Sequence, residues 1–182
     1  MVKRGYNGLS ALDALRTTLN DASTREVINE NGHIWRAGFT FGKPATEEEI
    51  ADVKMLLSLP LPASYEQFLR RFNGALLYKD KEYGQWGFHL YGTADLVREN
   101  ERWRHFYDGK LPEKYLATAK SLGDVDLLLL DTAQQVKDGT DCPVIDGNAD
   151  DPPARWKQAA RSFSDWLDRL VVAQGAKYWR WY

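Results

Sequence analysis

The chain has 182 residues, of which 43% are hydrophobic and 13% aromatic, so it can bury one core and is too apolar to be disordered throughout. Its 24 basic and 26 acidic residues give a net charge of −2, which disfavours non-specific binding of nucleic acid by the whole surface. A single cysteine excludes an internal disulfide, and no apolar stretch approaches the roughly 18 residues of a membrane span, so we expect a cytoplasmic protein without membrane contact.

The first part of the chain shows a helical pattern and then an extended one. Apolar residues recur through residues 9–28, which predicts an amphipathic helix entered near Ser10. The apolar positions of this predicted helix are Leu9, Leu12, Leu15, Leu19, Val27 and Ile28. Residues 34–41 instead place apolar side chains at alternate positions, which predicts a strand that the Gly-Lys-Pro run at 42–44 ends. We therefore expect residues 1–33 to form a helical extension.

Two helices with clear end signals are predicted next. Thr46 and Glu49 have the spacing of a capping box, in which each side chain binds the backbone N–H of the other residue, so a helix should begin there. Its apolar positions are Ile50, Val53, Leu56 and Leu57. The second helix lies in LPASYEQFLRRFNGALL, residues 61–77, where Pro62 suits the first turn and the Asn-Gly pair at 73–74 tolerates a left-handed stop. Its buried stripe should consist of Tyr65, Phe68, Leu69 and Phe72.

The second half of the chain contains mainly strand patterns, because beyond residue 74 the apolar residues change from helical to alternating spacing. Strands are predicted at 75–78, at 85–92, on both sides of a turn at 122–124 within residues 115–131, and at 142–146. In the second of these, Trp86, Phe88 and Leu90 should share one face, and His89 and Tyr91 the other. Helices are predicted from about Ala94 to Phe106, capped by Thr93, and in RSFSDWLDRLVV at 161–172.

The order of these motifs resembles the SUKH superfamily, the Smi/Knr-type cell-wall assembly regulator domain. The LPxxYxxFLxxxNG core is its most specific part, and the resemblance covers about residues 36–172. Ala75 departs from it, because the family often has a second glycine there, and both terminal segments lie outside it. The resemblance implies an α+β fold of one domain, a mostly antiparallel sheet with helices packed mainly on one side. We expect this domain at residues 34–174, followed by an aromatic tail at 175–182.

The resemblance also implies a class of function. Bacterial members are largely immunity proteins that bind toxins delivered between competing cells, and fungal members are regulatory scaffolds in cell-wall synthesis and signalling. No catalytic residues are implied. We therefore expect a protein that is not an enzyme, needs no cofactor, and neutralises a cognate protein toxin by direct binding as a monomer or weak homodimer. A Smi/Knr-type regulatory scaffold is the alternative.

The residue chemistry agrees with the absence of a catalytic centre. His33, His89 and His105 are isolated from one another and lack any spacing that would place two imidazoles on one metal. Cys142 precedes a strand without an adjacent base, so we expect it to be a small buried residue. Asp124 and Asp126 match the DxD pattern of some metal sites, but aspartates beside glycine usually serve the turn itself.

Charge is distributed unevenly over the last third of the chain. Eight aspartates and one lysine between Ser121 and Ala154 give a local charge of −7, and six bases against two acids from Arg155 onward give +4. Either the basic segment neutralises the acidic one within the fold, or the acidic one faces a partner. We expect a partner-binding group on exposed loops, facing a toxin such as a basic nuclease and not nucleic acid itself. This group consists of Asp138, Asp141, Asp146, Asp150 and Asp151.

The last residues, YWRWY, offer two interpretations. They could form an exposed contact patch or fold back on the core, and packing is favoured because tryptophan is large and seldom left fully exposed.

Overall fold

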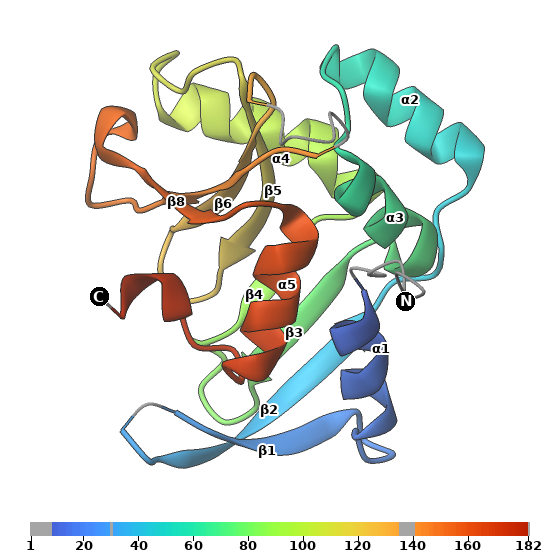
Figure 1. Cartoon of the computed structure of the whole chain (residues 1–182), viewed down its shortest axis with the longest axis vertical. Coiled ribbons are helices and arrows are strands. Elements are labelled where there is room, and N and C mark those ends of the chain that lie inside the picture. The colour runs from blue at the N-terminus through green and yellow to red at the C-terminus, as the bar shows by residue number, and fades with distance from the viewer. Residues whose placement is uncertain (1–8, 30, 135–140, 182) are drawn as a thin grey trace, which may run out of the picture.

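The computed structural model describes residues 9–29, 31–134 and 141–181, and it confirms the α+β fold of a single domain. One sheet of eight strands runs through this part of the chain, and each strand pairs antiparallel with the next (Figure 1). The strands are β1 (Thr24–Ile28), β2 (Ile34–Phe41), β3 (Ala75–Asp80), β4 (Phe88–Leu90), β5 (Tyr115–Ser121), β6 (Leu127–Asp131), β7 (Val144–Gly147) and β8 (Lys157–Ala160).

Helices interrupt this meander of strands at several points. They are α1 (Ser10–Thr17), α2 (Glu47–Leu57), α3 (Ala63–Phe72), α4 (Thr93–Phe106) and α5 (Phe163–Val172), with short 3₁₀ turns η1 (Pro153–Arg155) and η2 (Tyr178–Arg180). The capping box of α2 is confirmed, because the Glu49 N–H donates to the Thr46 hydroxyl over 3.1 Å and the Thr46 N–H to the Glu49 carboxylate over 2.8 Å. The predicted stop of α3 is also confirmed, since Asn73 adopts the left-handed conformation.

The prediction of one helix across residues 9–28 is wrong in its second half. Helix α1 ends at Thr17, and β1 forms the edge strand of the sheet by pairing with β2. The reversal lies between them, where the Asn20 side chain accepts a hydrogen bond from the Thr24 N–H over 2.8 Å and Ser23 has a φ of 53°. Val27 continued the apolar pattern of the helix, but it is β-branched and its side chain is buried from a strand instead.

Two further predictions need correction. The strand at 85–92 contains only Phe88–Leu90, because Gly87 has a φ of 117° and ends the extended conformation. Trp86 therefore lies outside the strand and is 62% exposed. In α2, Leu56 is exposed although its neighbour Leu57 is buried, because the apolar run is wider than the face that packs.

Helix α5 lies in front of the central strands and packs against α3 and α1 (Figure 1). The predicted stripe of α3 is fully buried there. Phe68 contacts Phe163 of α5 with ring centroids 5.3 Å apart, and Phe88 of β4 meets Trp166 edge-on at 5.9 Å. Helix α3 therefore packs on α5 through aromatic rings, and it also contacts the sheet directly, because the rings of Phe72 and Phe41 of β2 lie 5.4 Å apart.

Helix α4 is joined to β5 by one buried amide. The pairing of β5 with β6 shifts between Ala117 and Ala119, which marks a bulge. The Asn100 side chain accepts from the Ala117 N–H over 2.8 Å and donates to the Ala117 carbonyl over 2.9 Å and the Leu96 carbonyl over 2.8 Å. Asn100 therefore bonds to both the N–H and the carbonyl of Ala117, beside the bulge.

The aromatic tail packs on the core, as predicted. Trp179 lies 6.1 Å from both Phe88 and Trp166, measured between ring centroids, and Trp181 remains partly exposed. Residues on both sides of the predicted boundaries at 33/34 and 174/175 thus share one sheet and one core, and the division of the chain at those points stays a prediction. In the part of the chain described, no helix has both the length and the apolar character required to traverse a bilayer.

Candidate functional site

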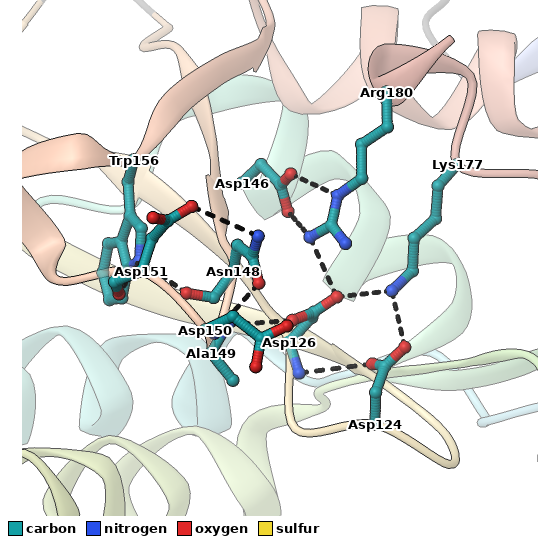
Figure 2. Close-up of polar contacts among 10 residues, drawn as sticks. All are labelled: Asp124, Asp126, Asp146, Asn148, Ala149, Asp150, Asp151, Trp156, Lys177 and Arg180. Carbon is teal, nitrogen blue, oxygen red and sulfur yellow. Dashed lines mark hydrogen bonds and ion pairs between the residues drawn. The ribbon is translucent and has the colours of Figure 1, made fainter.

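Three aspartates, two from one turn and one from a strand, meet two cations of the C-terminal segment (Figure 2). Asp124 and Asp126 lie in the turn between β5 and β6, and Asp146 lies in β7, where it pairs with Leu128 of β6. We call the three aspartates together with Lys177 and Arg180 the tail clamp.

Arg180 makes the most directional contacts of the tail clamp. Its guanidinium binds the Asp146 carboxylate in a bidentate manner, with Nε–Oδ2 at 2.6 Å and Nη2–Oδ1 at 2.7 Å, and Nη2 also lies 2.8 Å from Asp126 Oδ2. Lys177 Nζ bridges Asp124 Oδ2 at 2.7 Å and Asp126 Oδ2 at 2.5 Å. Two cations thus hold three carboxylates, and they anchor the end of the chain to the sheet.

Asp126 lies at the centre of the tail clamp and is 5% exposed. Burial by itself would raise the pKa of this carboxyl, but Lys177, the Ala149 N–H at 2.9 Å and Arg180 outweigh burial, so the pKa is lowered from its ordinary value. Asp126 therefore remains ionised at neutral pH, where its charge is compensated inside the fold.

These ion pairs favour internal neutralisation over a partner surface for part of the acidic segment. Asp124, Asp126 and Asp146 are neutralised within the fold, and Lys114 pairs in the same way with Asp131 at 2.8 Å. The expectation that Asp146 lies on an exposed loop is wrong, because it is a strand residue, 8% exposed and bound to Arg180.

A pH-dependent loss of stability follows from Asp126. Because its pKa is lowered from 3.8 in the folded state, the stabilisation is fully present above about pH 4 and is lost as the pH falls through the folded pKa. Asp126→Asn should lower the free energy of unfolding by about 1–3 kcal/mol at pH 7. Urea titrations from pH 7 to pH 2 should show this difference between wild type and variant shrinking below about pH 4. Asp52→Asn, on the exposed face of α2, is the control, and a difference for Asp126→Asn that does not change with pH would contradict the assignment.

The loop at residues 148–151 is tied down beside the tail clamp (Figure 2). Trp156 Nε1 donates to the Asn148 carbonyl over 2.9 Å and to the Asp151 carbonyl over 3.1 Å. The Asn148 side chain accepts from the Asp150 N–H over 3.0 Å and donates to the Asp151 carboxylate over 3.3 Å. The loop therefore has a defined conformation, with Asp150 exposed and the Asp151 side chain 40% exposed.

The structure does not bring the whole predicted binding group together. Asp138 lies outside the described residues. Asp141 precedes β7 and accepts a hydrogen bond from Ser64 of α3 over 2.9 Å. Asp150 and Asp151 follow β7, at its opposite end, so among the members of the group that the structure describes, this pair is the candidate for an exposed acidic contact.

The reasoning from sequence missed the role of Lys177, Arg180 and Trp156. The opposite charges of the acidic segment and the basic segment were a signal for pairing, but they did not indicate which residues meet. No pattern in the sequence indicated that the Trp156 indole would bond to both ends of the loop at 148–151.

Nucleophilic and metal chemistry find little support in the described residues. Burial, followed by the charges of Asp141 and Asp131, raises the pKa of the Cys142 thiol to about 12. Burial also lowers the pKa of His89 although Asp95 lies 3.3 Å away, so the imidazole is mainly neutral at pH 7. Within residues 9–29, 31–134 and 141–181, no group of three or more His, Cys, Asp or Glu side chains could share a metal ion.

Comparison with known families identifies the fold. The model of the SMI1/KNR4 family (SUKH-1) matches residues 44–169, more than half of the chain. The chain belongs to this family. It is also similar to the uncharacterized protein YnaB of Bacillus subtilis (strain 168), with 26% identity over 151 residues that cover 79% of this chain and 88% of the relative.

The residues matched by the SUKH-1 model include only part of the candidate site. All three aspartates of the tail clamp and the loop at 148–151 fall within the matched residues, whereas Lys177 and Arg180 lie beyond residue 169. Helix α1 and strands β1 and β2 precede the match. The cations that neutralise the acidic turn therefore come from a segment outside the family pattern.

Proposed function

We propose that this SUKH-1 protein is a non-enzymatic binding protein that neutralises a cognate bacterial toxin by direct contact in the cytoplasm, as a monomer or weak homodimer. Membership of the SUKH-1 family supports a binding role. Burial raises the pKa of the Cys142 thiol to about 12, and the described carboxylates of the tail clamp are paired with Lys177 and Arg180, so neither group is poised for nucleophilic chemistry.

The loop at 148–151 carries the proposal for the contact surface. Its two ends are held by Trp156, so its carboxylates need little further ordering when a partner binds. Asp150 points from this loop as an exposed charge, and Asp151 is only loosely paired, with Arg155 4.0 Å away. A pair of fixed, accessible carboxylates suits a basic cleft of the kind that nucleases use to hold phosphates.

Association with such a toxin should depend on these two charges. Asp150→Lys combined with Asp151→Lys should slow association with the purified toxin domain about tenfold or more and leave the melting temperature nearly unchanged, because the affected charges are exposed and act mainly on the rate of encounter. Stopped-flow measurements at low and high salt test this, since charges separated by more than about 8 Å are screened at physiological ionic strength.

Glu48→Lys combined with Asp52→Lys is the matched control, because it makes the same change of charge on the exposed face of α2 and should alter the rate far less. We expect the gene of the cognate toxin to lie next to the gene of this protein, so the toxin domain to purify is the one that such a neighbouring gene encodes. Failure of the wild-type protein to bind it or to inhibit its activity would reject the immunity function and favour the regulatory scaffold. Binding with equal rates for both double variants would leave the function intact and place the interface elsewhere.

A further inference from the structure

The sheet has a face that is not covered by α5. Phe88 points toward Trp166 of α5, so His89, the next residue of β4, points to the opposite side. Residues directly opposite His89 on the neighbouring strands point to the same side, so this second face continues from β4 onto β3 and β2 and onto β5. Its cross-strand neighbours are Thr40, Leu76, His89 and Lys120.

A groove of about 520 Å³ lies beside this face, where β2, β3, helix α1 and the segment that precedes β1 meet. Three cations line it, Arg16 from α1, Lys79 from β3 and Lys81 from the turn after β3, and none of the lining residues within the described part of the chain is acidic. We call these residues, together with Gly38, Thr40 and Leu76, the basic groove.

The cations of the basic groove are exposed and unpaired, unlike the charges of the tail clamp. Among the residues that the structure describes, none of Arg16, Lys79 and Lys81 forms an ion pair. Three adjacent like charges repel one another, so a negative ligand is the natural complement of this surface.

Two of the cations are also held in position. The Arg16 guanidinium lies over the rings of Phe41 and Phe72, 5.2 and 5.4 Å from their centroids. The aliphatic part of Lys81 lies across Gly38, where an added Cβ would come within 2.6 Å of the Lys81 Cδ atom. A glycine in β2 thus leaves the space through which Lys81 passes.

The lining of the basic groove distinguishes between classes of anion. Leu76 is half-buried and offers apolar surface, and the Thr40 hydroxyl can bond to backbone or carboxylate groups. Single-stranded nucleic acid needs open aromatic faces for its bases, but Arg16 covers Phe41, and Phe39 is buried against Tyr78 with ring centroids 4.9 Å apart.

We propose that the basic groove binds an acidic segment of a protein partner, in which carboxylates meet Arg16, Lys79 and Lys81 and apolar side chains rest on Leu76. This surface is separate from the loop at 148–151, and the inference goes beyond the proposed function because it does not require the partner to be a toxin.

A short fluorescein-labelled peptide of alternating glutamate and leucine tests the groove without any toxin. Lys79→Glu combined with Lys81→Glu should weaken binding of this peptide about tenfold or more, as measured by fluorescence anisotropy, because two attractive charges become repulsive. Lys110→Glu combined with Lys157→Glu makes the same change of net charge at exposed sites outside the groove and should weaken binding less than about twofold. In NMR titrations of the wild-type protein, the peptide should shift the backbone amides of Gly38, Thr40 and Leu76.

Several results would overturn the proposal. Equal weakening by both double variants would mean general charge attraction, and amide shifts confined to other strands would place the peptide elsewhere. Tighter binding of an oligothymidine than of the peptide would assign the groove to nucleic acid. Absence of peptide binding by the wild-type protein would reject the groove as a site for acidic segments, whatever the outcome with the toxin.

Discussion

Phe68→Ala should lower the free energy of unfolding by about 3–5 kcal/mol, one of the largest losses expected from a single substitution here. Phe68 is fully buried, and its ring contacts Tyr65 and Phe72 of α3 and Phe163 of α5 at centroid distances of 5.3 to 6.0 Å. Removing the ring takes apolar contact from both helices and leaves a cavity that neighbouring rings cannot fill without moving. Urea unfolding followed by circular dichroism measures the loss.

Phe106→Ala is the matched control for this prediction. Phe106 is the last residue of α4 and is 61% exposed, so the same truncation should cost less than about 1 kcal/mol. Similar losses for the two variants would show that α3 is not the centre of the core. The two substitutions remove identical atoms, so the larger loss of stability expected for Phe68→Ala is due to the burial of Phe68.

Asn100→Ala should lower the free energy of unfolding by about 2–5 kcal/mol, since it removes the partner of two buried backbone groups of β5. The N–H and the carbonyl of Ala117 both bond to the Asn100 side chain, and each unpaired buried group costs about 1–3 kcal/mol. Amide exchange at Ala117, measured by NMR, should become faster than at neighbouring positions of β5, because the bond that protects this N–H is lost.

Glu101→Ala, at the next position of α4, is the control, because Glu101 lies on the exposed side of the helix. It should change stability by less than about 0.5 kcal/mol. Equal losses in Asn100→Ala and Glu101→Ala would indicate that the helix itself, and not its bond to the bulge, limits stability.

Local signals in the sequence were sufficient for α2 and α3. The capping box at Thr46 and Glu49 uses only groups three residues apart, and Pro62 and Asn73 act through their own backbone preferences. The stripe of α3 was also predicted, because helical geometry alone places its members on one face. Such elements depend on neighbouring residues, so they can be predicted without knowing the rest of the fold.

Other elements depended on contacts between distant residues. Val27 suited either a helix or a strand, and pairing with β2 decided between them. The bulge in β5 is stabilised by Asn100, 17 residues before Ala117, which bonds to the Ala117 backbone groups. Neither outcome has a local signal, because the free energy that decides it comes from tertiary hydrogen bonds and burial.

The candidate site shows the same division. The sequence by itself determined that acidic and basic residues gather in successive segments of the last third of the chain, and that the chain has the motif order of the SUKH-1 family. Only the tertiary structure decided which charges are available, because Lys177 and Arg180 reach Asp126 from more than fifty residues away. A buried charge must be paired where it lies, so three of the eight aspartates of the acidic segment are paired in the tail clamp. Asp150, Asp151 and the cations of the basic groove remain accessible to partners.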